Sequence, residues 1–343
     1  MTHLLVIAHE ATRTGAPRVL HDLLVDLSGR MQVSYTVRLL KGGPLEADLR
    51  RLDRPGAETP AAVLVNSAVA AASLLDLDPR LPSAVYVHEE GDTLRGLPED
   101  ARLALTRRAA LVLAPSDAAV TDLIALGVDS GRVRLLPPVV VPSSFSPAEA
   151  DRARERMGAP PDRPLVVGCG EATWRKGADL FLATVAQLRR TLPVSAAWIG
   201  RRFSSDERRL DLDASLWRLD PEICWVGEVD AVAPFLAAAD LLVMTSREDP
   251  QPLTPLEAAA AGTATCGFAI GGLVDLADVG AAATVPYPDV VGLGDVAVRV
   301  LDDAAARDRL VSRGRARLAR RQSLDVVGPA FAAIVEQLLA EAR

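Results

Sequence analysis

Short apolar runs rich in β-branched residues alternate along the chain with longer stretches of helical periodicity. This alternation is typical of βα units whose strands form a parallel sheet. Five such runs fall in each half of the chain. They lie at residues 4–8, 33–39, 62–65, 83–87, 111–114, 165–169, 195–199, 223–226, 241–245 and 263–268. Two sets predict an α/β protein with two doubly wound, Rossmann-like domains, since 343 residues is about twice the length of a typical domain.

A proline-rich segment separates the two sets of runs. Four prolines fall within residues 137–147, and they forbid a regular helix and favour a semi-rigid, extended connector. We therefore expect an N-terminal domain over residues 1–140 and a C-terminal domain over residues 141–326. Residues 327–343 carry apolar side chains at helical spacing and are expected to form an amphipathic helix.

Charge and hydropathy argue against several classes of protein. A formal net charge of −7 argues against a nucleic-acid-binding protein, which would carry a basic excess on one face. No uninterrupted apolar run reaches the roughly 18 residues of a membrane-spanning helix, and the N-terminus lacks the basic segment of a signal peptide. The sequence predicts a cytoplasmic protein. It leaves open a peripheral membrane contact through a local basic patch, and it does not indicate an oligomeric state.

The three cysteines indicate neither disulfides nor a metal site. Cys169, Cys224 and Cys266 are far apart in the sequence, and no C-x-x-C pair or suitably spaced histidine accompanies them. We expect no metal and no cofactor.

The first loop that could bind a ligand follows the first predicted strand. In a doubly wound sheet it lies at the carboxyl edge of the strands, where ligands bind. Gly15 would allow a ligand close to the backbone at the start of the next helix, whose free N–H groups suit an anion. An ordinary strand-to-helix turn is the alternative, since the three-glycine dinucleotide fingerprint is absent.

The equivalent loop of the second half carries two adjacent cations, Arg175 and Lys176, at the start of a helix. The helix dipole disfavours cations there, so we expect a negative partner, and a phosphate group would be suitable. Of the 38 basic residues only Lys41 and Lys176 are lysines, and a lysine is a compact charge that can reach a phosphate oxygen. A solvated basic pair is the alternative.

A third loop joins the predicted strand at 241–245 to an alanine-rich helix. It is acidic and stiffened by Pro250 and Pro252, which have no N–H. A rigid loop with few fixed donors suits a preorganised binding site. The backbone donors left for a ligand are those of Gln251, Leu253 and Thr254.

Together these features resemble the retaining GT-B glycosyltransferases of family four, the glycosyl transferases group 1. The resemblance spans most of the chain. It is carried by residues 174–181, Trp-Arg-Lys-Gly-Ala-Asp-Leu-Phe, by residues 247–250, Arg-Glu-Asp-Pro, and by residues 14–17, Thr-Gly-Ala-Pro. It implies two Rossmann-like domains facing a cleft, with the nucleotide-sugar donor on the C-terminal domain and the acceptor on the N-terminal one. It also implies that the closing helix packs back onto the N-terminal domain.

The resemblance implies roles for single residues as well. Arg175 and Lys176 match a pair that neutralises the donor diphosphate, and Gly15 matches the loop beside it. Glu257 matches the second acid of a Glu-x7-Glu motif, whose carboxylate binds the ribose diol. His88 matches an active-site histidine near the transferred sugar.

Two of these residues have a structural alternative. His88 follows a predicted strand, where local hydrogen bonds can satisfy a histidine. Glu257 can complete a capping box with Thr254 at the start of its helix, with Pro255 at the first helical position.

The sequence departs from the family pattern at two positions. The first acid of the motif is Asp249, with Glu248 just before it, and Ala16 stands where many relatives have a second glycine. Seven residues separate Asp249 from Glu257, as the motif requires. We therefore expect Asp249 to accept a hydrogen bond from a sugar hydroxyl, and Glu248 to face Arg247 or solvent.

The implied function is transfer of a sugar, with retention, from a UDP-, GDP- or dTDP-linked donor to a sugar, lipid or natural-product acceptor. Its main requirement is stabilisation of charge on the departing diphosphate. Arg175, Lys176 and the loop N–H groups can supply this without a metal. The alternatives are a catalytically silent GT-B scaffold that binds a partner, and a GT-B sugar-nucleotide epimerase that needs no acceptor.

Overall fold

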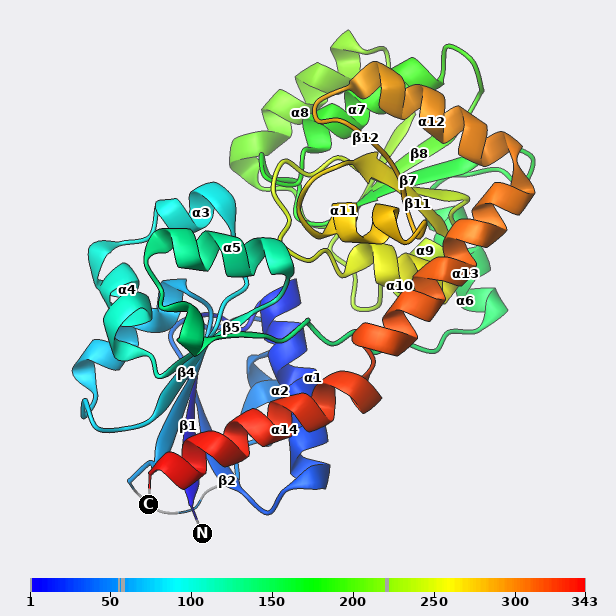
Figure 1. Cartoon of the computed structure of the whole chain (residues 1–343). Coiled ribbons are helices and arrows are strands. Elements are labelled where there is room, and N and C mark those ends of the chain that lie inside the picture. Colours follow the sequence, from blue (N-terminus) through cyan, green and yellow to red (C-terminus); the bar gives the residue numbers. More distant parts are fainter. Residues whose placement is uncertain (1, 55, 57–58, 220–221, 343) are drawn as a thin grey trace. The chain divides into compact units, whose positions relative to one another are not determined.

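The computed structural model describes residues 2–54, 56, 59–219 and 222–342, and the chain divides into two compact units (Figure 1). The first unit holds Met1–Val141 and Arg320–Arg343, and the second holds Pro142–Ala319. The first boundary lies one residue from the expected one, and the second lies seven residues before it. Gln322 already bonds within the first unit, where its carbonyl oxygen accepts from the N–H of Val140 at 2.8 Å.

The first unit contains a sheet of six parallel strands in the order β2-β1-β3-β4-β5-β6. β1 pairs with β2 on one side and with β3 on the other, so the winding reverses between β1 and β3. The carboxyl ends of strands at such a switch point are where doubly wound sheets bind ligands. The strands are β1 (His3–Ala8), β2 (Ser34–Leu39), β3 (Ala62–Asn66), β4 (Ser83–Tyr86), β5 (Leu111–Ala114) and β6 (Val133–Leu135).

The second unit repeats this plan with six parallel strands in the order β12-β11-β10-β7-β8-β9. Its winding reverses between β7 and β10, which pair directly. The strands are β7 (Leu165–Cys169), β8 (Ser195–Ile199), β9 (Ile223–Gly227), β10 (Leu241–Met244), β11 (Ala264–Phe268) and β12 (Ala283–Val285).

Helices cover both faces of the second sheet, as the alternating residues of β7 illustrate. Val166 enters one apolar core with α7, α8 and α12, whereas Leu165 and Val167 enter another with α6, α9 and α10. A strand buried on both faces reads as a continuous apolar run, which is the pattern seen in the sequence. The helices of this unit include α6 (Pro147–Arg156), α7 (Ala178–Leu188), α8 (Ser204–Leu216), α9 (Ala233–Ala237), α10 (Thr254–Ala261), α11 (Gly271–Asp278) and α12 (Val290–Asp302).

The ten predicted strands are all present, with ends that differ by one residue at most. β6 and β12 were not predicted, because three residues at a sheet edge are too short to show an apolar run. Pro147 was expected in the connector, and that was wrong: it begins α6. At the first position of a helix the backbone N–H has no partner within the helix, so proline loses no hydrogen bond there. Ser146 caps this helix in a capping box with Glu149.

The chain ends in α14 (Leu324–Glu341), which packs on α1 (Gly15–Arg30) and β3 within the first unit. It buries one face, with Val327, Phe331, Val335 and Leu338 almost inaccessible to solvent. Taken with α13 (Ala304–Arg321), this stretch is the one described segment long and apolar enough to cross a membrane by length and composition alone. The sequence analysis did not predict a membrane-spanning segment here, because charged residues interrupt the apolar run.

Candidate functional site

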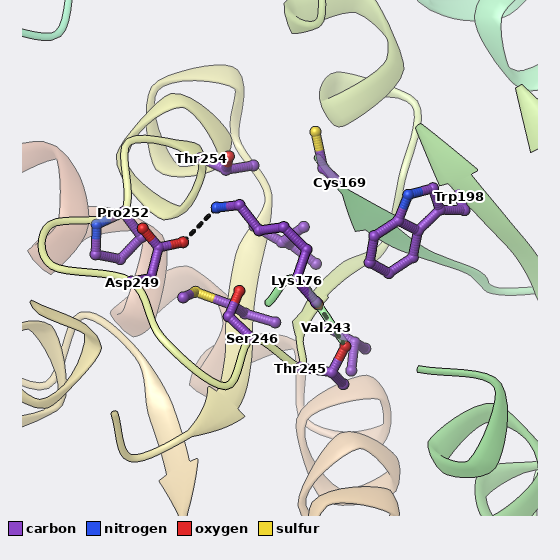
Figure 2. A pocket seen from close by; sticks show the side chains of 11 residues that line it. Cys169, Lys176, Trp198, Val243, Thr245, Ser246, Asp249, Pro252 and Thr254 are labelled. Carbon is purple, nitrogen blue, oxygen red and sulfur yellow. Dashed lines mark hydrogen bonds and ion pairs between the residues drawn. The ribbon is translucent and has the colours of Figure 1, made fainter. Parts of the chain in front are cut away.

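A pocket opens in the second unit at the carboxyl ends of β7 and β10, where the winding of the sheet reverses (Figure 2). One wall comes from the end of β7 and the turn that follows it, and the other from the loop between β10 and α10. The polar side chains that line it include Lys176, Thr245, Ser246, Asp249 and Thr254. The topology thus joins loops that lie about 70 residues apart in the sequence.

Lys176 and Asp249 form an ion pair inside this pocket. The Lys176 Nζ contacts the carboxylate Oδ2 of Asp249, and their side chains are 18% and 9% exposed. The Arg175 guanidinium is more exposed, donates to the carbonyl oxygen of Glu248 at 2.9 Å and lies 3.9 Å from Asp249 Oδ1. The negative partner expected for the two cations is therefore present as a protein carboxylate.

The turn that carries Lys176 is held against the end of β10. Gly177 has a φ of +66°, and a Cβ there would lie 2.1 Å from the carbonyl oxygen of Thr245. The Thr245 hydroxyl donates to the Gly177 carbonyl oxygen at 2.8 Å. Only glycine fits both the left-handed backbone and this close approach.

Arg247 fixes the same turn from the other side, a role that was not predicted from the sequence. Its N–H donates to the Arg175 carbonyl oxygen at 2.7 Å, and its guanidinium donates to the Trp174 carbonyl oxygen. The guanidinium also forms a bidentate pair with Asp179, at 2.9 and 2.7 Å. Burial opposes ionisation of Asp179, but the hydrogen bonds from Arg247 outweigh it and lower the pKa of that carboxyl. Arg247 therefore pairs with Asp179.

The loop before α10 offers backbone donors to a ligand. Within the described residues, the N–H groups of Gln251, Leu253 and Thr254 have no acceptor. The helix begins after Leu253, which has no side-chain oxygen, so the capping box of Thr254 with Glu257 is not formed. The structural alternative for Glu257 was therefore wrong. The loop presents unpaired donors at the start of a helix, an arrangement that suits an anion.

The pocket gathers only part of the predicted donor-binding set. Lys176, Asp249 and Thr254 line it, whereas Gln251, Leu253, Glu257 and Arg175 do not. Glu248 is also absent from its walls. The Nε2 of Gln251 is buried without a hydrogen-bond partner among the described residues.

Gly15 and His88 lie in the first unit, at the β1/β3 switch point and the strand next to it. Gly15 begins α1, and Thr14, at the N-cap position, makes no side-chain capping bond. His88 follows β4, and its Nε2 lies 2.8 Å from Oδ1 of Asn66 at the end of β3. Burial lowers the pKa of His88 to about 4 despite the opposing charge of Glu89, so the ring is neutral at pH 7.

Within the described residues, no group of three or more His, Cys, Asp and Glu side chains could hold a metal ion. The sequence contains Asp-x-Asp patterns at residues 76–78 and 211–213, and each has at least one carboxylate paired with an arginine. Asp78 bonds to Arg80, and Asp211 bonds to Arg202. The three cysteines are free.

Two six-stranded, doubly wound sheets with polar residues at each switch point define the GT-B fold class. Two solved structures have a similar fold over nearly the whole chain. HepE from Anabaena in complex with UDP-glucose is 18% identical, with a TM-score of 0.84 over 98% of this chain and 100% of that one. WaaG, a glycosyltransferase involved in lipopolysaccharide biosynthesis, is 16% identical, with a TM-score of 0.76 over 97% and 99%. Residues 163–303 match the glycosyl transferases group 1 family.

Curated relatives match part of the chain. A D-inositol 3-phosphate glycosyltransferase from Acidothermus cellulolyticus is 31% identical over 43% of this chain and 35% of its own length. The lipopolysaccharide core biosynthesis mannosyltransferase LpsB from Rhizobium meliloti is 28% identical over 56% of this chain and 57% of its own. The aligned region thus covers about a third of the length of the first relative and somewhat more than half of the length of the second.

Removal of one charge of the Lys176–Asp249 pair should destabilise the protein more than replacement of both residues by neutral ones. Lys176→Met leaves a buried carboxylate without its nearer cation, and the double variant Lys176→Met with Asp249→Asn removes that carboxylate charge as well. We expect a coupling energy of about 0.5–3 kcal/mol from the double-mutant cycle. Urea denaturation measures it, with Lys41→Met as the control. Strictly additive effects would show that the pair contributes no coupling.

Proposed function

We propose that this protein is a retaining glycosyltransferase that moves a sugar from a nucleotide-sugar donor to a sugar, lipid or natural-product acceptor, without a metal. The observation that carries the proposal is the Lys176–Asp249 pair at the β7/β10 switch point, beside the unpaired N–H groups before α10. A cation with free donors suits a diphosphate, and a carboxylate suits sugar hydroxyls. The glycosyltransferase relatives and the UDP-glucose bound to HepE support this combination.

The proposed mechanism depends on charge that develops on the leaving diphosphate. An ammonium group has three donors, so Lys176 can keep one bond to Asp249 and offer the others to phosphate oxygens. Arg175 is partly exposed and can turn from the Glu248 carbonyl toward the same group. Positive charge and N–H groups fixed before the reaction stabilise the transition state without reorganisation. No dedicated pair of acid and base carboxylates is then required.

The remaining residues serve the other parts of the substrate. In the second unit, Asp249 accepts from a hydroxyl of the transferred sugar, and Glu257 binds the ribose diol. The backbone donors of Gln251, Leu253 and Thr254 complete the donor site. In the first unit, His88 serves the transferred sugar and Gly15 the diphosphate. We propose that the enzyme acts in the cytoplasm.

A panel of UDP-, GDP- and dTDP-linked sugars tests the function. A donor present at 100 times its dissociation constant should add about 2.7 kcal/mol of stability in a thermal-shift experiment. Transfer from that donor to added acceptors should then persist in EDTA, because protein cations supply the charge. Activity that is lost in EDTA and restored by a divalent ion would exclude the metal-free mechanism. A changed donor without any acceptor would indicate an epimerase, and binding without turnover a silent scaffold.

Lys176→Ala should lower turnover more than it weakens donor binding, because charge on the leaving group peaks in the transition state. Measurement of kcat together with the donor dissociation constant separates the two effects. Lys41→Ala is the matched control, since Lys41 is the only other lysine and is exposed. Unchanged transfer by the double variant Arg175→Ala with Lys176→Ala would show that these cations play no part in the reaction.

Asp249→Asn should reduce the donor kcat/KM by roughly 10- to 150-fold, while Glu248→Gln should remain near wild type. The loss of a hydrogen bond to a charged group costs about 1.5–3 kcal/mol, which gives this range. Of these two acids only Asp249 lines the pocket, so Glu248→Gln serves as the neighbouring control. The opposite order of the two effects would place the sugar contact on Glu248.

A further inference from the structure

Asn66 ties together three neighbouring loops of the first unit. It ends β3 and is only 2% exposed. Its Nδ2 donates to the carbonyl oxygen of Ala16, in the first turn of α1, at 3.0 Å. Its Oδ1 lies 2.8 Å from Nε2 of His88, which follows β4. One buried amide thus connects the segments that leave β1, β3 and β4 at the edge of the sheet where ligands bind.

The chemistry of these atoms fixes the proton on the His88 ring. A carbonyl oxygen can only accept, so the bond to Ala16 orients the Asn66 amide with its NH2 group toward α1. The amide oxygen that remains can also only accept, so Nε2 of the neutral His88 ring must carry the proton. Nδ1 is then an acceptor with a free lone pair. No described residue donates to it.

Glu89 holds the backbone on both sides of this contact. Its Oε2 accepts from the N–H groups of His88 at 2.8 Å and Ala68 at 3.0 Å, and its Oε1 accepts from the Ser67 hydroxyl at 2.5 Å. Ser67 has a φ of +128°, a conformation that costs a non-glycine residue about 1–3 kcal/mol. The strained backbone of Ser67 persists because its hydroxyl and the next N–H, that of Ala68, both donate to the Glu89 carboxylate.

We propose that Asn66 is a positioning residue that sets the ring orientation and the tautomer of His88, so that Nδ1 accepts a hydrogen bond from a substrate hydroxyl. The part that concerns the substrate rests on the proposed function, and the tautomer does not. The Tyr86 ring, 4.3 Å from the His88 ring between centroids, packs beside it. Its hydroxyl donates to the Leu136 carbonyl oxygen, and burial raises its pKa, so it adds no charge.

The test reads the position of the proton by NMR and needs no turnover. Asn66 is the only asparagine in the chain and His88 is one of four histidines, so selective ¹⁵N labelling gives few signals. His88→Gln identifies the ring. We expect the wild-type His88 to be protonated on Nε2 and unprotonated on Nδ1 at neutral pH.

Two variants at Asn66 separate the effect of the amide oxygen from the effect of side-chain volume. Asn66→Leu has a similar volume and no acceptor, so a population protonated on Nδ1 should appear. Asn66→Asp keeps an oxygen beside Nε2 and adds a charge, so Nε2 stays protonated and the pKa of His88 rises by about 1–3. A wild-type ring protonated on Nδ1, or an unchanged tautomer in Asn66→Leu, would overturn the proposal. If Asn66→Leu does not fold, the wild-type and Asn66→Asp spectra decide.

Substrate binding and kinetics test the remaining part. Saturation with the nucleotide sugar that gives the largest thermal shift, alone and with an acceptor, should move the Nδ1 signal of His88. In Asn66→Asp, transfer should be lost below the raised pKa of His88 and recover above it, whereas the wild-type profile stays flat at neutral pH. An unmoved Nδ1 signal during active transfer would remove the hydroxyl contact. Absence of transfer from every donor would count against the proposed function and leave the tautomer result standing.

Discussion

The ion pair between Lys176 and Asp249 is the interaction on which the pocket of the second unit depends. It joins the turn after β7 to the loop after β10, the two segments that the switch point of the sheet brings together. Gly177 and Arg247 hold that turn in place through backbone contacts. A charged ligand that enters this pocket therefore exchanges partners with an existing pair, and its binding energy is reduced by the cost of that exchange.

The two units use the same place in the fold with different chemistry. In the second, full charges meet at the switch point, on side chains that are mostly screened from water. In the first, a neutral amide and a neutral imidazole meet, and the nearby charge of Glu89 is occupied by three donors from its own neighbours. Neutral groups with fixed protons can discriminate between hydroxyl orientations, whereas charged groups supply attraction. The polarity of each site thus follows from the side chains in the segments that leave its strands.

Sequence periodicity was sufficient to predict the architecture, because strands buried on both faces read as continuous apolar runs. The short edge strands β6 and β12 and the helical start at Pro147 were missed, since three residues carry no period and a proline at N1 resembles one in a connector. The residues that organise the sites were harder to recognise. Asn66 and Arg247 act through bonds to distant backbone atoms, which leave no local pattern. The one available signal for Asn66 was composition, because the single asparagine of the sequence stands directly after a predicted strand.

The path of α14 determines when the first unit can be completed during synthesis on the ribosome. This helix packs on α1 and β3 of the same unit, yet its residues emerge after the whole second unit. Until then the surfaces of α1 and β3 that α14 contacts are uncovered, while the second unit, continuous from Pro142 to Ala319, can already fold. The nascent chain therefore can complete its second unit before its first, the reverse of the usual order.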